Sequence, residues 1–215
     1  MTPFEQAFQY LRQNRPQGRY MGGSTGARGY DLPMGQFVGK RGDSPAHIQN
    51  EFDMNQYLNE LGVPVPQAQM QGNLMLTEME EGNQMGRATP QDIRQLTQDF
   101  TPHATIANWD MIGLGRDNII RRPDGTLSYV DVGGAGAFRA QGAPKGGAFG
   151  STVGELDTLR QKNPELAGIT EQDIGQSWDR YGGEDAFNQA LKVLRDKNTQ
   201  NIMQQRIQDV ARRVA

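Results

Sequence analysis

The chain has 215 residues, of which 22 are basic and 25 acidic, so its formal net charge is −3. A chain of this length can bury a sizeable core, in one domain or in two small lobes. The slight negative charge gives no basic field of the kind that binds nucleic acid, so we expect no nucleic-acid partner. Cysteine is absent and there are only two histidines, which excludes disulfides and thiolate metal sites and disfavours histidine-rich zinc sites.

No targeting or membrane segment is recognisable in the sequence. Residues 1–16 lack the basic start and the apolar core of a signal peptide. No run approaches the roughly 20 apolar residues that span a bilayer. We therefore expect a soluble protein without membrane insertion. Its 27 glycines gather in a few stretches, which favours specific loops over general disorder.

The first 82 residues alternate between helical and extended patterns. Apolar residues recur at helical spacing after Phe4 and after Ile48, and Ser44 followed by Pro45 is typical of a helix start. The expected elements are, in order, a helix over residues 4–15, a glycine-rich segment over 22–29, a polar turn over 31–35, a strand over 36–40, a helix over 44–62, an extended segment over 63–66 and a buried strand over 74–78.

A change of character near residues 81–88 marks the expected boundary between a first lobe (residues 1–82) and a second lobe (residues 83–215). The segment is charged and contains glycine, as linkers often are. The helical pattern that starts at Thr89 runs to about residue 108. We expect a break in it at Pro102, because proline removes a backbone donor.

One hairpin and a set of helices are expected in the second lobe. Pro123-Asp124-Gly125 is a good turn between strands at residues 118–120 and 127–131. Glycine-rich residues 133–150 can only form a loop. Helices follow, predicted from two apolar stripes: Phe187, Ala190, Leu191 and Leu194, and then Ile202, Ile207, Val210 and Val214.

The glycine-rich segment GGSTGARG is a candidate phosphate-binding loop. Backbone amides in such a turn can approach phosphate oxygens closely, because no side chain intervenes. The segment matches neither the P-loop pattern nor the full dinucleotide fingerprint, and a flexible surface loop is the alternative. The candidate binding residues are Gly22, Gly23, Ser24, Thr25 and Gly26.

A lysine and a glutamate follow this segment in an order that suits triphosphate binding. Lys40 ends an apolar strand, and Glu51 lies on the next helix. A lysine beneath a phosphate-covering loop can neutralise phosphate charge, and a helical glutamate can hold that lysine in place. The alternative is a solvated lysine with an unrelated surface glutamate, but the order of loop, strand and helix favours the functional pair.

Three polar residues around the hairpin form the most informative pattern. Asp110 follows a helix, Asn118 enters the first hairpin strand, and Asp131 ends the second. Asp110 could orient a hydroxyl nucleophile, while Asn118 and Asp131 could ligate Mg²⁺ beside a nucleotide triphosphate. Asp117 competes for either role. The structural alternative treats the aspartates as loop caps and turn residues.

Taken in this order, the residues resemble the atypical branch of the protein-kinase-like superfamily. Asn108-Trp109-Asp110 matches the Asn-x-Asp context of its catalytic aspartate, and Asp131-Val132-Gly133 matches its metal-binding Asp-x-Gly. The resemblance covers roughly residues 20–140. It is closest to actin-fragmin kinase and HipA-type kinases, with phosphatidylinositol kinases more distant. The chain departs from ordinary protein kinases in lacking His-Arg-Asp, Asp-Phe-Gly and Ala-Pro-Glu, and in a longer gap between Asp110 and Asn118.

The resemblance implies an α+β, two-lobed protein-kinase-like fold. The small N-lobe would hold an antiparallel sheet with one helix, and the minimal C-lobe would be mostly helical. The implied function is an ATP-dependent phosphotransferase that moves the γ-phosphoryl group of Mg-ATP to a hydroxyl. The acceptor would be a protein or a small molecule, and a protein is favoured.

The resemblance also implies a role for each candidate residue. Lys40 would contact the phosphates and Glu51 would form its ion pair. Asp110 would be the catalytic base or the group that orients the nucleophile. The metal ligands would be Asn118 and Asp131, and the hinge whose backbone meets adenine would include Glu78 and Met79.

Three alternatives stay open. The first is a pseudokinase or assembly component that binds a partner without catalysis. The second is nucleotidyl transfer, or small-molecule phosphorylation, on the same fold. The third is a glycine-rich α+β domain without a nucleotide site. The minimal C-lobe suggests a compact bacterial or bacteriophage protein, cytoplasmic or delivered as an effector or virion component.

Overall fold

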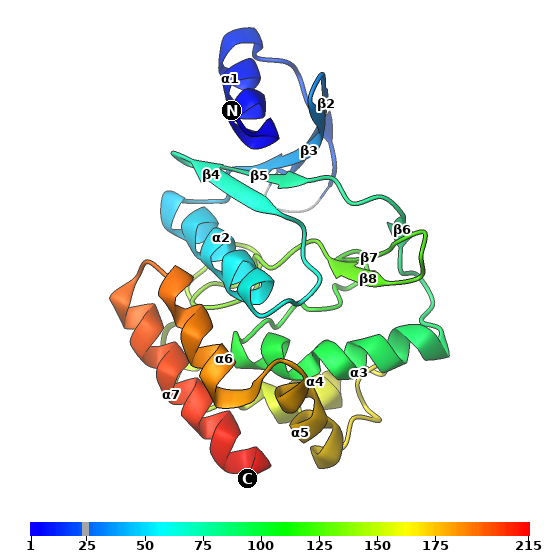
Figure 1. Ribbon diagram of the computed structural model, residues 1–215, viewed down its shortest axis with the longest axis vertical. Coiled ribbons are helices and arrows are strands. Elements are labelled where there is room, and N and C mark those ends of the chain that lie inside the picture. The colour runs from blue at the N-terminus through cyan, green and yellow to red at the C-terminus, as the bar shows by residue number, and fades with distance from the viewer. Residues whose placement is uncertain (23–25) are drawn as a thin grey trace.

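The computed structural model describes residues 1–22 and 26–215. Figure 1 shows a five-stranded sheet with helix α1 at one end of the molecule and a helical region at the other, with helix α2 between them. No helix in the described part of the chain combines the length and the apolarity needed to cross a membrane.

The larger sheet is antiparallel throughout, with the strand order β1-β2-β3-β5-β4. Leu32 pairs with Gly35 across a tight hairpin, so the turn expected over residues 31–35 is shorter than predicted and its first residues belong to a strand. Two short strands that the sequence did not predict, β1 and β4, form the sheet edges. The strands are β1 (Arg19–Tyr20), β2 (Arg28–Leu32), β3 (Gly35–Lys40), β4 (Ala68–Gln71) and β5 (Leu74–Glu78).

Two helices cover the two faces of this sheet. The predicted N-terminal helix is confirmed as α1 (Pro3–Asn14), and the second is confirmed as α2 (Pro45–Glu60), which Ser44 caps. Leu76 packs against α1 while its neighbour Met75 packs against α2, because successive strand side chains point to opposite faces. The same alternation places Lys40, the partner of Met75 across the strands, on the α2 face.

Most of the core lies in the helical region, which also contains a small three-stranded sheet of order β6-β7-β8. The predicted hairpin is confirmed as β7 (Ile119–Arg121) and β8 (Leu127–Tyr129). Strand β6 (Asn83–Gln84) pairs with β7, and the lobe boundary at residues 82 and 83 stays a prediction. The helices here are α3 (Pro90–Thr105), α4 (Glu155–Lys162), α5 (Glu171–Arg180), α6 (Gly183–Ala190) and α7 (Lys197–Val214), with 3₁₀ turns at η1 (Gly146–Ala148) and η2 (Leu191–Val193).

The two regions are joined through α2. Its residues Met54, Tyr57 and Leu58 are fully buried in the core of the helical region. The Tyr57 hydroxyl donates a hydrogen bond to the Phe187 carbonyl of α6 at 3.3 Å. Because one helix contacts both the sheet and the helical core, it sets where sheet residues meet those from the hairpin.

The break expected at Pro102 is wrong, since α3 continues through it to Thr105. Proline at this position leaves the carbonyl of Gln98 without its helical donor. The hydroxyl of Ser177 on α5 donates to that carbonyl at 2.7 Å and accepts from the Thr101 N–H at 3.1 Å. A side chain distant in sequence therefore replaces the missing backbone hydrogen bond.

Replacing Ser177 by alanine is expected to destabilise the fold by about 1–3 kcal/mol, because the Gln98 carbonyl would lose its partner in a buried position. Urea unfolding of the variant measures the change. Ser151→Ala, an exposed serine, is the matched control and should change stability by less than about 0.5 kcal/mol. Equal stability of the two variants would contradict this role of Ser177.

Candidate functional site

The sheet and the hairpin bring three charged residues together. The Lys40 Nζ, at the end of β3, lies 2.7 Å from Glu51 Oε1 of α2 and 3.3 Å from Asp131 Oδ1, just after β8. Lys40 and Glu51 are buried, whereas the Asp131 side chain is 37 % exposed. Lys40 is therefore held by the buried carboxylate of Glu51, and it also contacts the partly exposed carboxylate of Asp131.

The charges of this group are mutually dependent. Burial alone would lower the pKa of Lys40, but the carboxylates of Asp131 and Glu51 outweigh it and hold the pKa above its usual value. Burial likewise opposes ionisation of Asp131, yet Lys40 and the Gly133 N–H keep the pKa of Asp131 below its usual range. Burial raises the pKa of Glu51 against the attraction of Lys40. The result is a protonated lysine beside an ionised, accessible aspartate.

Helix α2 also holds the backbone that follows Asp131. The Gly133 N–H donates to Asp131 Oδ1 at 2.9 Å, and the Gly133 carbonyl lies 3.2 Å from His47 Nε2. A Cβ on Gly133 would lie 3.2 Å from both Asp131 Oδ1 and Glu51 Oε2, so a larger residue would push the carboxylates apart. Asn50 bonds the Ala135 carbonyl at 2.9 Å. The sequence reasoning missed His47 and Asn50, which carry no motif.

Asp110 lies next to this group on the loop after α3. A Cβ on Gly134 would be 3.1 Å from the Asp110 Cβ, so the two loops are in close contact. The Asn118 Nδ2 donates to the Asp110 carbonyl at 2.6 Å, which leaves the Asn118 amide oxygen for another ligand. Burial and the negative charges of Asp131 and Asp117 raise the pKa of Asp110. The structure thus brings Asp110 into contact with Asn118 and with the loop that follows Asp131.

Asn108, the residue before Trp109, anchors this loop to helix α3. The side chain of Asn108 lies 3.1 Å from His103 Nδ1, and both residues are fully buried. Burial lowers the pKa of His103 to about 3, so the ring stays neutral and its Nδ1 can accept from the amide. Arg116, further along the loop, bonds Glu165 Oε1 at 2.6 Å, which is a structural role rather than a contact with the cleft.

A cleft of about 200 Å³ lies between the large sheet and the hairpin. Lys40, Asn118 and Asp131 line it together with Gly22 and Glu78, and Asp117 faces it as well. This volume is below the roughly 300–1,000 Å³ of most ligand sites, so a nucleotide would have to widen the cleft.

The candidate residues Glu51, Asp110 and Gly26 are not among the residues that line this cleft. Gly26 is exposed, while Gly23, Ser24 and Thr25 lie outside the described residues. Met79 is not among the residues that line the cleft. The N–H groups of Glu78 and Met79 donate to the Gln67 and Gln36 carbonyls, each at 3.0 Å. Adenine could therefore meet carbonyls of this segment but not these two donors.

The donor set of the cleft fits a magnesium ion with bound phosphates. The Lys40 and Gly133 contacts both use Asp131 Oδ1, which leaves Asp131 Oδ2 outside these two contacts, and Asn118 lines the same cleft. Magnesium prefers such oxygen ligands and usually keeps one or two from the protein, with waters and phosphates completing the octahedron. Within the described ranges no cluster of three or more acidic or histidine side chains forms a protein-only cage, and this type of site needs none.

Residues 133–150 are mostly irregular, as predicted, and the side chain of Lys145 anchors them to neighbouring backbone. Its buried Nζ donates to the carbonyls of Ala107 at 2.6 Å and Gly134 at 2.8 Å, and lies 4.5 Å from the centre of the Trp109 ring. Lys145 thus joins the loop before Asp110 to the loop after Asp131. The sequence offers no local signal for this contact.

Stability is expected to depend on pH through Lys145. Burial lowers its pKa to about 7, so between about pH 7 and the unfolded pKa near 10.5 the folded state has lost a proton that the unfolded state keeps. Stability therefore rises with pH in this window. The gain from pH 7 to 9 should be about 2 kcal/mol, measured by urea unfolding, and Lys145→Met should remove it. An unchanged pH dependence in that variant would contradict the assignment.

No protein-family model matches the chain, and the search of curated proteins finds no match. Among solved structures the chain is similar to the crystal structure of the Helicobacter pylori proinflammatory kinase CtkA, with a TM-score of 0.54. The match covers 94 % of this chain and 95 % of that one, at 11 % sequence identity. It does not test the specific likeness to actin-fragmin kinase or HipA-type kinases. The predicted fold class is confirmed: the chain has an α+β, kinase-like fold.

Proposed function

We propose that this protein transfers the γ-phosphoryl group of Mg-ATP to a hydroxyl group. The observation that carries the proposal is the ion pair of Lys40 with Glu51, aimed at Asp131 across the cleft. On a kinase-like fold, such a group suits charge neutralisation on a triphosphate, which provides most of the catalysis in phosphoryl transfer.

Each residue at the cleft has a separate role in this proposal. Lys40 binds phosphate oxygens, and Glu51 keeps its ammonium in place. Asn118 and Asp131 would hold Mg²⁺ through oxygen atoms. When bound, the ion would neutralise charge that develops on the phosphate oxygens. The backbone amides of the glycine-rich segment, residues 22–26, would cover the phosphates, and the carbonyls near Glu78 and Met79 would meet adenine.

Asp110 is proposed to orient the acceptor hydroxyl and to accept its proton. A general base works best when its pKa approaches the working pH, and burial beside Asp131 and Asp117 shifts the pKa of Asp110 upward. Gly134 leaves room for its carboxylate, because any side chain there would meet the Asp110 Cβ. Asp110 therefore combines a position against Gly134 with a raised pKa.

The test is transfer of label from ATP to the protein itself, to the proteins and small molecules of a lysate, and to water. With Mg²⁺ and γ-labelled ATP, the wild type should transfer phosphate, and Asp110→Asn should be slower by about 10²–10⁴-fold. Asp185→Asn, an exposed aspartate on α6, is the matched control and should keep the wild-type rate. Transfer of label from α-labelled ATP would show nucleotidyl transfer instead of phosphoryl transfer. Nucleotide binding without any transfer would show that the protein is a pseudokinase.

A further inference from the structure

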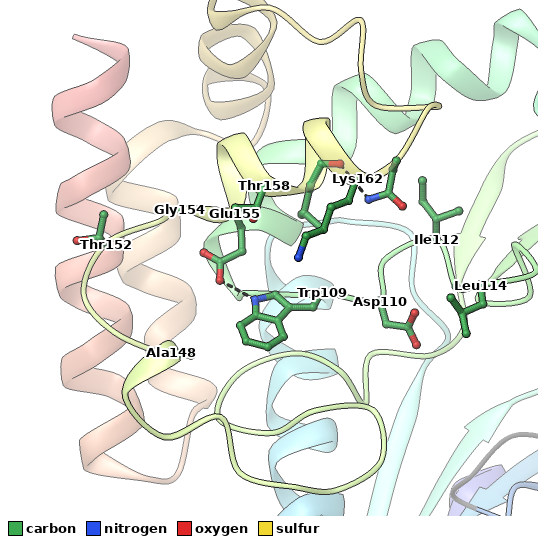
Figure 2. Close-up of a pocket in the computed structure, with 13 residues that line it drawn as sticks. Trp109, Asp110, Ile112, Leu114, Ala148, Thr152, Gly154, Glu155, Thr158 and Lys162 are labelled. Carbon is green, nitrogen blue, oxygen red and sulfur yellow. Dashed lines mark hydrogen bonds between the residues drawn. The ribbon is translucent and has the colours of Figure 1, made fainter.

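A second cavity is lined by Asp110 but not by Lys40, and has a volume of about 520 Å³ (Figure 2). Three segments enclose it: the loop 109–114, the end of the glycine-rich loop at 148–154, and helix α4. This volume lies within the roughly 300–1,000 Å³ of sites that take small molecules. A recess walled by three segments suits a compact ligand better than an extended peptide.

Of the two charged residues of α4 that line this cavity, Glu155 has partners for both oxygens and Lys162 has no carboxylate partner among the residues that the structure describes. Glu155 is fully used, since Oε1 accepts from Trp109 Nε1 at 2.8 Å and Oε2 accepts from Arg206 at 2.6 Å. Lys162 is exposed, and no carboxylate within the described ranges pairs with it. Figure 2 shows its side chain extending from α4 toward the space between Trp109 and Asp110. The cavity therefore offers one free cation opposite the proposed catalytic carboxylate.

The remaining wall combines apolar side chains with the uncharged polar side chains of Thr152, Thr158 and Asn163. Buried Ile112 and Leu159 line it, Trp109 is 36 % exposed there, and Leu114 projects fully into solvent at its rim. Sites of this kind place a few convergent polar groups on a mainly apolar lining, and the polar groups fix the orientation of the ligand. Here they would place a hydroxyl at Asp110 and a negative group at Lys162.

We propose that this cavity binds the phosphoryl acceptor, and that the acceptor is a small hydroxylated molecule with an anionic group that pairs with Lys162. This inference rests on the proposed function. The acceptor oxygen forms a bond to the γ-phosphorus of ATP, the bond from that phosphorus to the β–γ bridging oxygen breaks, and ADP leaves. The hydroxyl proton passes to Asp110. Lys162 touches the acceptor but takes no part in the bond changes.

The two tryptophans of the chain provide a direct binding assay. Trp178 is 5 % exposed and packs on Phe187, so Trp178→Phe leaves Trp109 as a reporter within the cavity. The probes are glycerate, glycerol 3-phosphate, inositol monophosphate and glucose 6-phosphate. Their neutral counterparts are glycerol, inositol and glucose, and a mixture of serine and threonine peptides serves as the rival acceptor class.

At least one anionic probe is expected to change Trp109 emission in a saturable way, with its neutral counterpart binding at least tenfold more weakly. Lys162→Gln should raise the Kd of that probe at least tenfold. Lys192→Gln, an exposed lysine of η2, is the matched control and should leave the Kd unchanged. The same probe should be phosphorylated by Mg-ATP, with KM raised by Lys162→Gln far more than kcat is lowered.

The inference is overturned if no anionic probe binds, if Lys162→Gln leaves the Kd unchanged, or if only the peptides bind. Should Trp178→Phe fail to fold, saturation-transfer NMR on the wild type and Lys162→Gln gives the same comparison. Because the binding assay needs no ATP, its result is separate from that of the proposed function. If label is transferred but no anionic probe binds, the proposed acceptor class is wrong and the phosphoryl transfer stands. If an anionic probe binds but no label is transferred, the proposed phosphoryl transfer is wrong.

Discussion

Asp131→Asn should lower the rate of phosphoryl transfer by at least about 100-fold while the chain stays folded. Asparagine keeps the size of the side chain but removes the charge that faces Lys40 and that would bind the metal. Loss of one preorganised electrostatic group commonly costs about 10²–10³ in rate. The side chain is 37 % exposed, so the fold does not depend on burying it.

The measurement is ADP formation with saturating Mg-ATP, together with the far-UV circular dichroism of each variant. Asp185→Asn removes an exposed carboxylate elsewhere and should behave as the wild type. A folded Asp131→Asn protein with wild-type turnover would remove Asp131 from the site. An unfolded variant would show that this residue is structural, in which case Asp131→Glu, which keeps the charge, should recover folding.

Arg206→Ala is expected to lower the free energy of unfolding by about 3–5 kcal/mol, the cost of leaving a buried charge without its partner. Arg206 is fully buried and its guanidinium bonds Glu155 Oε2 at 2.6 Å. It also donates to four backbone carbonyls, at Thr105, Ala104, Gly150 and Thr152. Truncation would therefore expose one carboxylate and several carbonyls to an apolar interior.

Urea unfolding of Arg206→Ala tests this expectation, with Arg212→Ala as the matched control. Arg212 lies on the same helix but its side chain is 72 % exposed, so its loss should cost less than about 0.5 kcal/mol. Arg206 also has a bearing on the second cavity, because Glu155 holds Trp109 as well. A loss of less than 1 kcal/mol for Arg206→Ala would contradict the buried ion pair.

The sequence predicted the elements whose signals are local. The capped start of α2 and the turn of the hairpin were recognisable because cap and turn residues act within a few positions. The edge strand β4, with the sequence AQMQ, was not recognisable because it has only four residues and, although they alternate in polarity, alanine and glutamine do not favour strands. Its pairing with β5 decides its conformation.

The meeting of Lys40 with Glu51 and Asp131 was also foreseeable in outline. Strand alternation puts Lys40 on the α2 face, and the order of elements brings the end of β8 to it. The supports of the site were not foreseeable, because His47, Asn50 and Lys145 act on backbone groups distant in sequence. These contacts depend on the tertiary structure and leave no pattern.

Two residues show where the sequence signal could have been read more closely. Pro102 predicts a break only if nothing else satisfies the Gln98 carbonyl, and Ser177 does so from another helix. Arg206 lies three residues after Met203 and four before Val210, both fully buried in α7. A charged residue on the apolar face of a helix indicates a buried partner, although the sequence does not identify Glu155 as that partner.

The most direct test of the central claim is the melting temperature of the wild type with and without Mg-ATP, compared with Lys40→Met. At about ten times the Kd, a ligand that binds only the folded state adds about 1.4 kcal/mol. For a chain of this size, that is a rise of about 3–6 °C. The account predicts this rise for the wild type, a dependence on Mg²⁺, and little or no rise for Lys40→Met. No rise at millimolar Mg-ATP, or an equal rise in both proteins, would contradict a nucleotide site built on Lys40, Glu51 and Asp131.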